Sequence, residues 1–136
     1  MAFMVWNDRL MTGIAAIDSD HRRLLGIVND LYEAIQEGQS HEQVTELMRM
    51  LTDYTRVHFA REERFFATTH YAGAAEHKAE HDGMVRWVAQ IQAQVENGTA
   101  VAPSLEVMNY LKDWLFDHIL GSDQRYVRHL TAAGVR

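Results

Sequence analysis

The chain has 136 residues, a formal net charge of −6 and no cysteine, and hydrophobic residues make up 47% of it. This length and apolar content suit a single domain with a buried core, which we expect to span residues 1–136. The absence of cysteine excludes disulfides, thiolate-bound metals and a thiol nucleophile. The acidic balance, without a basic patch, argues against nucleic acid as a partner.

The N-terminal residues MAFMVWNDRL lack the basic region and the long apolar run of a signal peptide. No segment approaches the roughly 20 apolar residues that span a membrane. We therefore expect a soluble, cytoplasmic protein that has no membrane partner. Residues 1–17 are expected to be irregular, with Trp6 and Ile14 packing on the rest of the fold.

Two amphipathic helices are predicted in the first half of the chain. The first is expected over residues 19–36, with Asp18 as its N-cap and Gly38 just past its end. The second is expected over residues 40–66. It opens with Ser40-His41-Glu42-Gln43, a capping-box pattern in which Ser40 and Gln43 satisfy backbone groups of the first turn.

Two further helices are predicted in the second half. The third is expected over residues 73–96 and stops at Asn97-Gly98. The fourth begins after Pro103, is interrupted at Gly121, and is followed by a short helix at about residues 122–131. The connections are short, so neighbouring helices should be antiparallel. The expected fold is all-α: an up-down-up-down four-helix bundle with an irregular N-terminal segment and a short C-terminal helix.

Histidine is unusually frequent, with eight residues where average composition would give about three. Five of them continue the apolar stripes of the four helices, and their positions near alternate helix ends bring them to one end of the bundle. These five are His21, His58, His77, His81 and His118. The other three match no stripe and are expected on the surface: His41, His70 and His129.

Convergence of five imidazoles in a core requires a partner, because an unpaired buried polar group costs several kcal/mol. A metal centre would supply that partner. Residues four apart lie one helical turn from each other on the same face, so His77 and His81 can bind a single ion. His58 and Glu62 can do the same, or Glu62 can bridge two ions.

Asp123 is a more demanding candidate ligand. It follows His118 by five residues, which on a regular helix places it about 140° away from the face of His118. Asp123 can therefore reach the same site only if the helix is distorted or ends between them. Gly121 makes such a distortion plausible.

The ordered set of motifs resembles the hemerythrin family, specifically its single-domain bacterial members. The resembling segments are Ile17-Asp18-Ser19-Asp20-His21, His58-Phe59-Ala60-Arg61-Glu62-Glu63, His77-Lys78-Ala79-Glu80-His81 and Trp114-Leu115-Phe116-Asp117-His118-Ile119 with Asp123. Trp6 and Thr12-Gly13-Ile14 are also similar to the N-terminal segment of that family. One departure is Ala72 after Tyr71, where the family often has proline; it affects the entry to the third helix and no ligand.

The resemblance implies a centre of two iron ions. One iron would be bound by His77, His81 and His118, and the other by His21 and His58. Glu62 and Asp123 would bridge the two irons together with an oxo or hydroxo group. Three bridging atoms and three histidines complete six positions on the first iron, whereas two histidines leave one position open on the second.

That open position implies a non-catalytic protein that binds O2 reversibly, for storage, for delivery to an oxygen-consuming enzyme, or for sensing. Leu115 and Ile119 flank His118 and are the candidate walls of the O2 pocket, although plain core packing would explain them equally well. Two alternatives stay open. One is a di-iron oxidase, a peroxidase or a nitric oxide-handling enzyme. The other is a structural or regulatory metal module, such as a zinc site, because nitrogen and oxygen ligands do not select iron by affinity alone.

Overall fold

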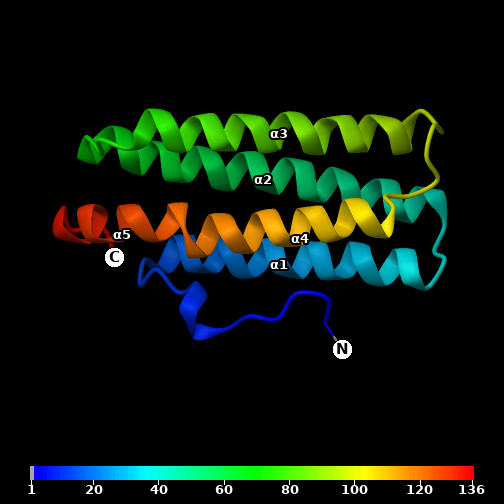
Figure 1. The fold of residues 1–136 in the computed structure, drawn as a ribbon, viewed down its shortest axis with the longest axis horizontal. Coiled ribbons are helices and arrows are strands. Elements are labelled where there is room, and N and C mark those ends of the chain that lie inside the picture. The colour runs from blue at the N-terminus through cyan, green and yellow to red at the C-terminus, as the bar shows by residue number, and fades with distance from the viewer. Residues whose placement is uncertain (1) are drawn as a thin grey trace.

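The computed structural model describes residues 2–136, and these residues form helices joined by short connections (Figure 1). The elements are a 3-10 turn η1 (Asp8–Leu10) and the helices α1 (Ala15–Gln36), α2 (His41–Thr69), α3 (Ala74–Glu96), α4 (Leu105–Leu120) and α5 (Ser122–Ala132). No strand occurs among the described residues. No helix in this part of the chain combines the length and apolar character needed to cross a membrane.

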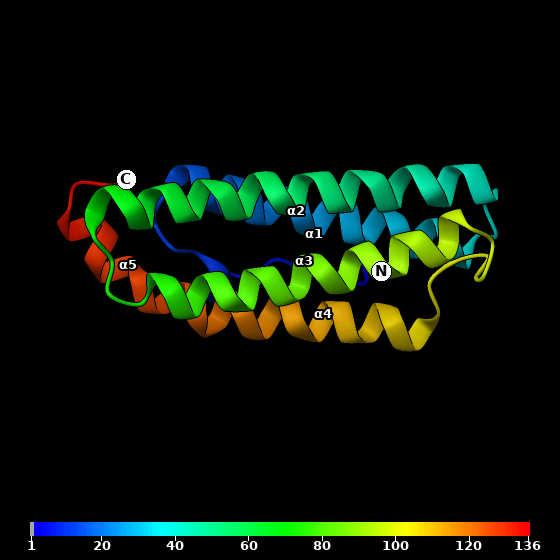
Figure 2. The ribbon, with the colours of Figure 1, turned by 90° about the horizontal axis from the view of Figure 1, so that it is seen from above.

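Helices α1 to α4 form the predicted up-down-up-down bundle, in which α1 packs on α2 and α2 packs on α3 (Figures 1 and 2). The α1–α2 and α3–α4 connections lie at one end. The α2–α3 turn, the start of α1 and the short α5 lie together at the other end. The fold class predicted from the sequence is therefore confirmed.

The interior consists of two apolar clusters. The larger runs along most of the bundle and includes Leu24 of α1, Phe59 of α2 and Met84 of α3. The smaller closes the end that carries α5; its buried members are Ile14, Ile17, Phe66, Tyr126 and Leu130. Helices α1, α2 and α3 contribute to both clusters, and buried polar residues lie between the two. On α1, for example, His21 separates Ile17 from Leu24. We give the name polar layer to the seven buried polar residues that gather between the clusters: His21, His58, Glu62, His77, His81, His118 and Asp123.

The start of α1 differs from the prediction. The helix begins at Ala15, four residues earlier than expected, and its N-cap position is Ile14 rather than Asp18. The Asp18 carboxylate lies inside the first turn and accepts hydrogen bonds from the backbone of Thr12 and Gly13, at 2.8 and 3.0 Å, and from the Thr12 hydroxyl at 2.8 Å. Asp18 thus fastens the preceding loop onto the helix, a role that requires donors the local sequence pattern does not reveal.

The remaining boundaries lie within a few residues of the predictions. The capping box at the start of α2 is confirmed, because the backbone N–H of Gln43 donates to Ser40 Oγ and that of Ser40 donates to Gln43 Oε1, both at 3.2 Å. Helix α2 continues to Thr69 and ends where His70 adopts a left-handed conformation. The N-terminal segment is not wholly irregular, since it contains η1 and ends at the fully buried Ile14.

Candidate metal centre

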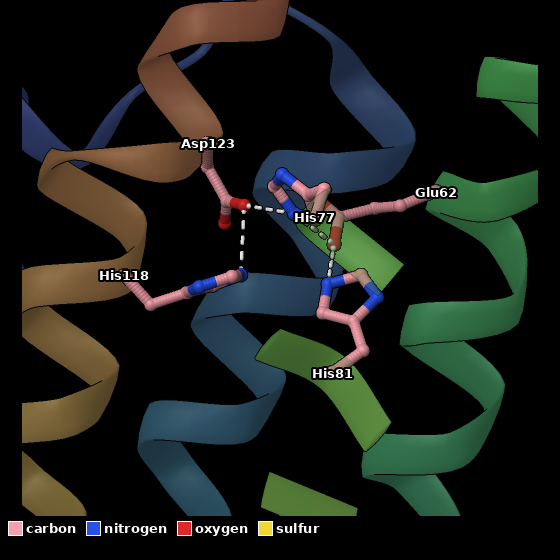
Figure 3. Close-up of side chains that lie close together, drawn as sticks. All are labelled: Glu62, His77, His81, His118 and Asp123. Atoms are coloured by element: carbon pink, nitrogen blue, oxygen red, sulfur yellow. Dashed lines mark ion pairs between the residues drawn. The ribbon is translucent and has the colours of Figure 1, made fainter. Parts of the chain in front are cut away.

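The structure brings all seven sequence-predicted ligands together in the polar layer, each less than 10% exposed. They fall into two groups of donor atoms that lie close enough to hold an ion. The larger group is Glu62, His77, His81, His118 and Asp123 (Figure 3), and the smaller is His21, His58, Glu62 and Asp123. Glu62 and Asp123 belong to both groups. The arrangement is thus two adjoining sites that share two carboxylates.

Asp123 reaches the layer because the fourth helix is broken. Helix α4 ends at Leu120, and α5 begins at Ser122 after a backbone bend at Gly121. A Cβ atom at Gly121 would lie 2.8 Å from the carbonyl oxygen of Asp117, closer than ordinary van der Waals contact. The expected distortion at Gly121 is confirmed, and the lack of a side chain there permits it.

The donor atoms of the layer approach one another without forming hydrogen bonds. The Nε2 atoms of His77 and His118 each lie 3.0 Å from Asp123 Oδ1, and His21 Nε2 lies 3.0 Å from Asp123 Oδ2. These atoms are nevertheless buried and lack a hydrogen-bond partner of suitable geometry, as do Glu62 Oε1 and His81 Nε2.

Such spacing fits metal coordination. Donors on adjacent corners of an octahedron lie about 3.0 Å apart when each metal–donor bond is about 2.1 Å. Buried polar atoms are rarely left unpaired in native proteins. Among the described residues ten buried side-chain atoms are unpaired, and seven of them are donor atoms of these two groups. The imidazole and carboxylate donor set suits iron, zinc and other first-row metals. The residues therefore fit a metal centre.

Three of the five histidines are held from behind by a carboxylate of the preceding helix. The Nδ1 of His58 donates to Asp20 Oδ2 at 2.9 Å, from α2 to α1. His81 of α3 donates in the same way to Glu63 of α2 at 2.8 Å, and His118 of α4 donates to Glu80 of α3 at 3.0 Å.

These contacts fix each ring so that Nε2 faces the centre, and they make the ring a stronger donor, as is common around metal-bound histidine. None of these three carboxylates was predicted from the sequence. A signal was present, because each one stands directly beside a predicted ligand in the chain: Asp20 beside His21, Glu63 beside Glu62, and Glu80 beside His81.

Asp20 is the most enclosed of these acceptors, at 3% exposed. Besides His58 it accepts hydrogen bonds from the Tyr54 hydroxyl at 2.7 Å and from Arg61 Nε at 2.8 Å. Burial alone would raise the pKa of Asp20, but the bonds from His58, Tyr54 and Arg61 outweigh burial and lower the pKa to about 2. Asp20 therefore stays ionised behind His58 at any physiological pH.

Tyr126 is a fourth supporting residue that was not predicted from the sequence. Its side chain is fully buried in the smaller apolar cluster, and its hydroxyl donates to Glu62 Oε2. Burial, reinforced by the charges of Asp123 and Glu62, raises the pKa of Tyr126 well above 10, so the phenol remains a donor. Tyr126 follows Asp123 by three residues, a spacing that puts both on one face of α5.

The protein atoms of the layer create a strong demand for positive charge. Burial opposes a charged His58, but the charge of Glu62 and the bond to Asp20 raise the pKa of His58 to about 10. Burial likewise opposes a charged His77, whereas Asp123 and Glu62 raise the pKa of His77 to about 9. Burial also favours neutral Glu62 and Asp123, yet the neighbouring histidines hold both pKa values below the usual range. Bound metal ions would satisfy the same demand.

Aromatic rings enclose the layer on the side of the larger cluster. Phe59 stacks on His81, with ring centroids 3.7 Å apart, and Trp114 stacks on His118 at 4.5 Å. The two predicted pocket residues, Leu115 and Ile119, are buried in the larger cluster beside His118. Their role as walls of an O2 pocket stays a prediction.

The three histidines that were predicted to lie on the surface are outside the polar layer. His41 and His70 are exposed. His129 is half-buried, and its Nε2 lies 2.8 Å from the carbonyl oxygen of Thr69, so it helps to pack α5 against the end of α2.

Comparisons with known proteins agree with this site. A family model described as the hemerythrin HHE cation binding domain matches residues 12–130. The bacteriohemerythrin of Pseudomonas aeruginosa is 37% identical over 127 residues, which cover 93% of this chain and 81% of that protein. The bacteriohemerythrin of Methylococcus capsulatus is 32% identical over 133 residues, covering 97% and 100%.

The fold comparison gives the same result. A crystal structure of wild-type hemerythrin superposes with a TM-score of 0.89 at 30% sequence identity, covering 96% of this chain and 99% of that one. The resemblance inferred from the ordered histidine and carboxylate motifs is therefore confirmed. The chain belongs to the hemerythrin family.

Proposed function

We propose that this protein holds two iron ions in the polar layer and binds O2 reversibly there. His77, His81 and His118 would bind one ion, His21 and His58 the other, and Glu62 and Asp123 would bridge them. The observation that carries the proposal is the pair of adjoining donor groups that share both carboxylates. A single-ion site would not need two buried carboxylates that each face histidines of both groups.

The two groups are unequal, and this inequality favours ligand binding at one side. The group with His21 and His58 has one histidine fewer than the other. An ion held there would have fewer protein ligands than its neighbour, and it would therefore be the one that offers O2 a binding position. Two ferrous ions, when bound, supply the two electrons that O2 binding at such a centre requires.

The contribution of the protein is to hold the donors and keep water away. The carboxylates behind His58, His81 and His118 fix the ring orientations. The apolar clusters above and below the layer leave little room for bulk water. In this low-dielectric setting the charged donors interact more strongly than they would in water. We propose Leu115 and Ile119 as the apolar walls closest to the O2 position.

We further propose a non-catalytic role, as a cytoplasmic store, carrier or sensor of O2, with an oxygen-consuming enzyme as one possible recipient. The alternative of a di-iron oxidase, peroxidase or nitric oxide-handling enzyme predicts steady consumption of peroxide or nitric oxide with a reductant. Multiple turnovers in such an assay would overturn the non-catalytic role. A single stoichiometric reaction per centre would support it.

The first test of the proposed function is the metal content of protein from cells grown without added metal. The expected result is two iron ions per chain. Two zinc ions per chain instead would contradict the O2-binding proposal and favour a structural metal module. Reduction under anaerobic conditions, followed by air, should then give a visible charge-transfer band that disappears when O2 is withdrawn.

A further inference from the structure

The metals must reach a layer whose seven proposed ligands are all buried. Two surface pockets each touch a different one of these ligands, His77 or His81. The first, of about 40 Å³, lies where the α2–α3 turn meets α5. It is lined by Tyr71, Gly73, Glu76, His77, Glu80, Ser122 and Arg125. We call it the turn pocket. The second, of about 200 Å³, lies between α2 and α3 and touches His81.

The second pocket is closed toward the metal centre. Phe59 lies flat on the His81 ring at 3.7 Å, and Glu63 occupies Nδ1 of the same ring at 2.8 Å. An ion in that pocket would therefore meet an apolar ring and a nitrogen that is already bonded.

The turn pocket is different because His77 presents a free nitrogen to it. Nδ1 of His77 has no hydrogen-bond partner among the described residues. Unlike Nε2 of the same ring, Nδ1 is not fully enclosed by protein, and His77 lines the turn pocket. Nε2 of the same ring lies 3.0 Å from Asp123 Oδ1 inside the layer. His77 is 4% exposed, and it belongs both to the lining of the turn pocket and to the larger donor group.

The charges around the turn pocket favour a cation. Glu76 and Glu80, one turn apart on α3, face a single arginine, Arg125, so the lining carries a net negative charge. Glu80 also accepts the hydrogen bond from His118 Nδ1 at 3.0 Å, which ties the pocket to a second proposed ligand. Carboxylate oxygen and imidazole nitrogen together are donors that ferrous iron accepts.

We propose that the turn pocket is the entry site for the metal, where Glu76 and Nδ1 of His77 capture a divalent cation before it passes to the three-histidine side of the centre. This proposal rests on the proposed di-iron centre. His77 lines the turn pocket, and its Nε2 lies 3.0 Å from Asp123 Oδ1 inside the layer, so one side chain stands at both ends of this path.

The test follows divalent-cation uptake by the full chain after metal removal, with Co²⁺ as the probe, because its visible absorption changes when it gains nitrogen ligands. Glu76→Gln should slow uptake by about three- to tenfold, since a lining charge that raises the local cation concentration is lost. Glu76→Lys should slow uptake further. Added salt should reduce the difference in uptake rate between each variant and the native protein. The plateau should stay at two ions per chain.

The matched control is Glu106→Gln, which removes the same charge from the first turn of α4, at the far end of the bundle. Equal uptake rates for the Glu76 and Glu106 variants would overturn the entry site. The proposed function is tested separately: a chain that takes up two ions at rates governed by Glu76 but shows no reversible O2 band with iron would retain the entry site and lose O2 binding.

Discussion

Replacement of Asp20 by asparagine should weaken metal binding although Asp20 touches no metal. The Asp20 carboxylate lies behind His58 at 2.9 Å and is held by Tyr54 and Arg61. Asparagine has the same shape. Its amide oxygen can still accept from His58 and Arg61, and its NH2 group can donate to the Tyr54 oxygen. The substitution therefore removes the negative charge and leaves the packing intact.

The charge makes His58 a stronger donor, and hydrogen bonds to an ionised acceptor are about twice as strong as neutral ones. Loss of such an outer partner typically costs about 10- to 100-fold in metal affinity, which corresponds to about 1.4–2.7 kcal/mol. The loss should fall on the ion held by His21 and His58. In competition with a coloured chelator, one ion of the variant should therefore be released at a lower chelator concentration than in the native protein. The other ion should be released at the same concentration as in the native protein.

Asp30→Asn is the control for this experiment, because it removes the same charge from an exposed position on the same helix. Equal affinities in the Asp20 and Asp30 variants would refute the reasoning that the outer carboxylates strengthen the histidine donors. Simultaneous release of both ions in Asp20→Asn would refute the assignment of His58 to one ion of the pair.

Four further predictions concern the layer itself. Tyr126→Phe leaves Glu62 Oε2 buried without its donor and should lower the free energy of unfolding by about 1–3 kcal/mol in urea denaturation; an unchanged midpoint would show that this bond contributes nothing. His118→Ala should lose one iron or the whole centre, and iron content with O2 binding equal to the native protein would break the ligand assignment. Because the pKa values of His58 and His77 are raised to about 10 and about 9, metal uptake at pH 7.5 should release about two protons per chain, measurable with an indicator dye. In the metal-stripped protein these two rings stabilise the fold fully below their unfolded pKa of 6.5, and this contribution is lost as pH rises through about 9 to 10; a melting temperature that rises over that range would contradict it.

The polar layer could be predicted because its histidines occupy positions in strong periodic patterns. His21, His58 and His118 continue apolar stripes, so burial and convergence follow from helical spacing alone. Asp123 required one additional inference, the break at Gly121, and the structure confirms the break. Metal identity does not follow from these patterns, since the same donors suit several metals.

Asp20, Glu63 and Glu80 each stand beside a predicted ligand in the chain, but the histidine that each one contacts could not be predicted from single-helix patterns. Glu63 stands next to Glu62, roughly 100° around the helix, and from α2 alone it reads as a solvated residue. Its contact with His81 exists only because α2 and α3 pack side by side. The N-cap of α1 was wrongly predicted for a similar reason, since the donors that bind Asp18 come from a loop whose path depends on the packed bundle.

The most direct test of the central claim is an O2 titration of the protein loaded anaerobically with ferrous iron. We predict one O2 bound per two irons and a visible band that grows in proportion to the bound O2. The band should disappear fully when O2 is removed, over repeated cycles. A band that never forms, or oxidation of the iron that removal of O2 does not reverse, would contradict reversible O2 binding at a shared two-iron centre.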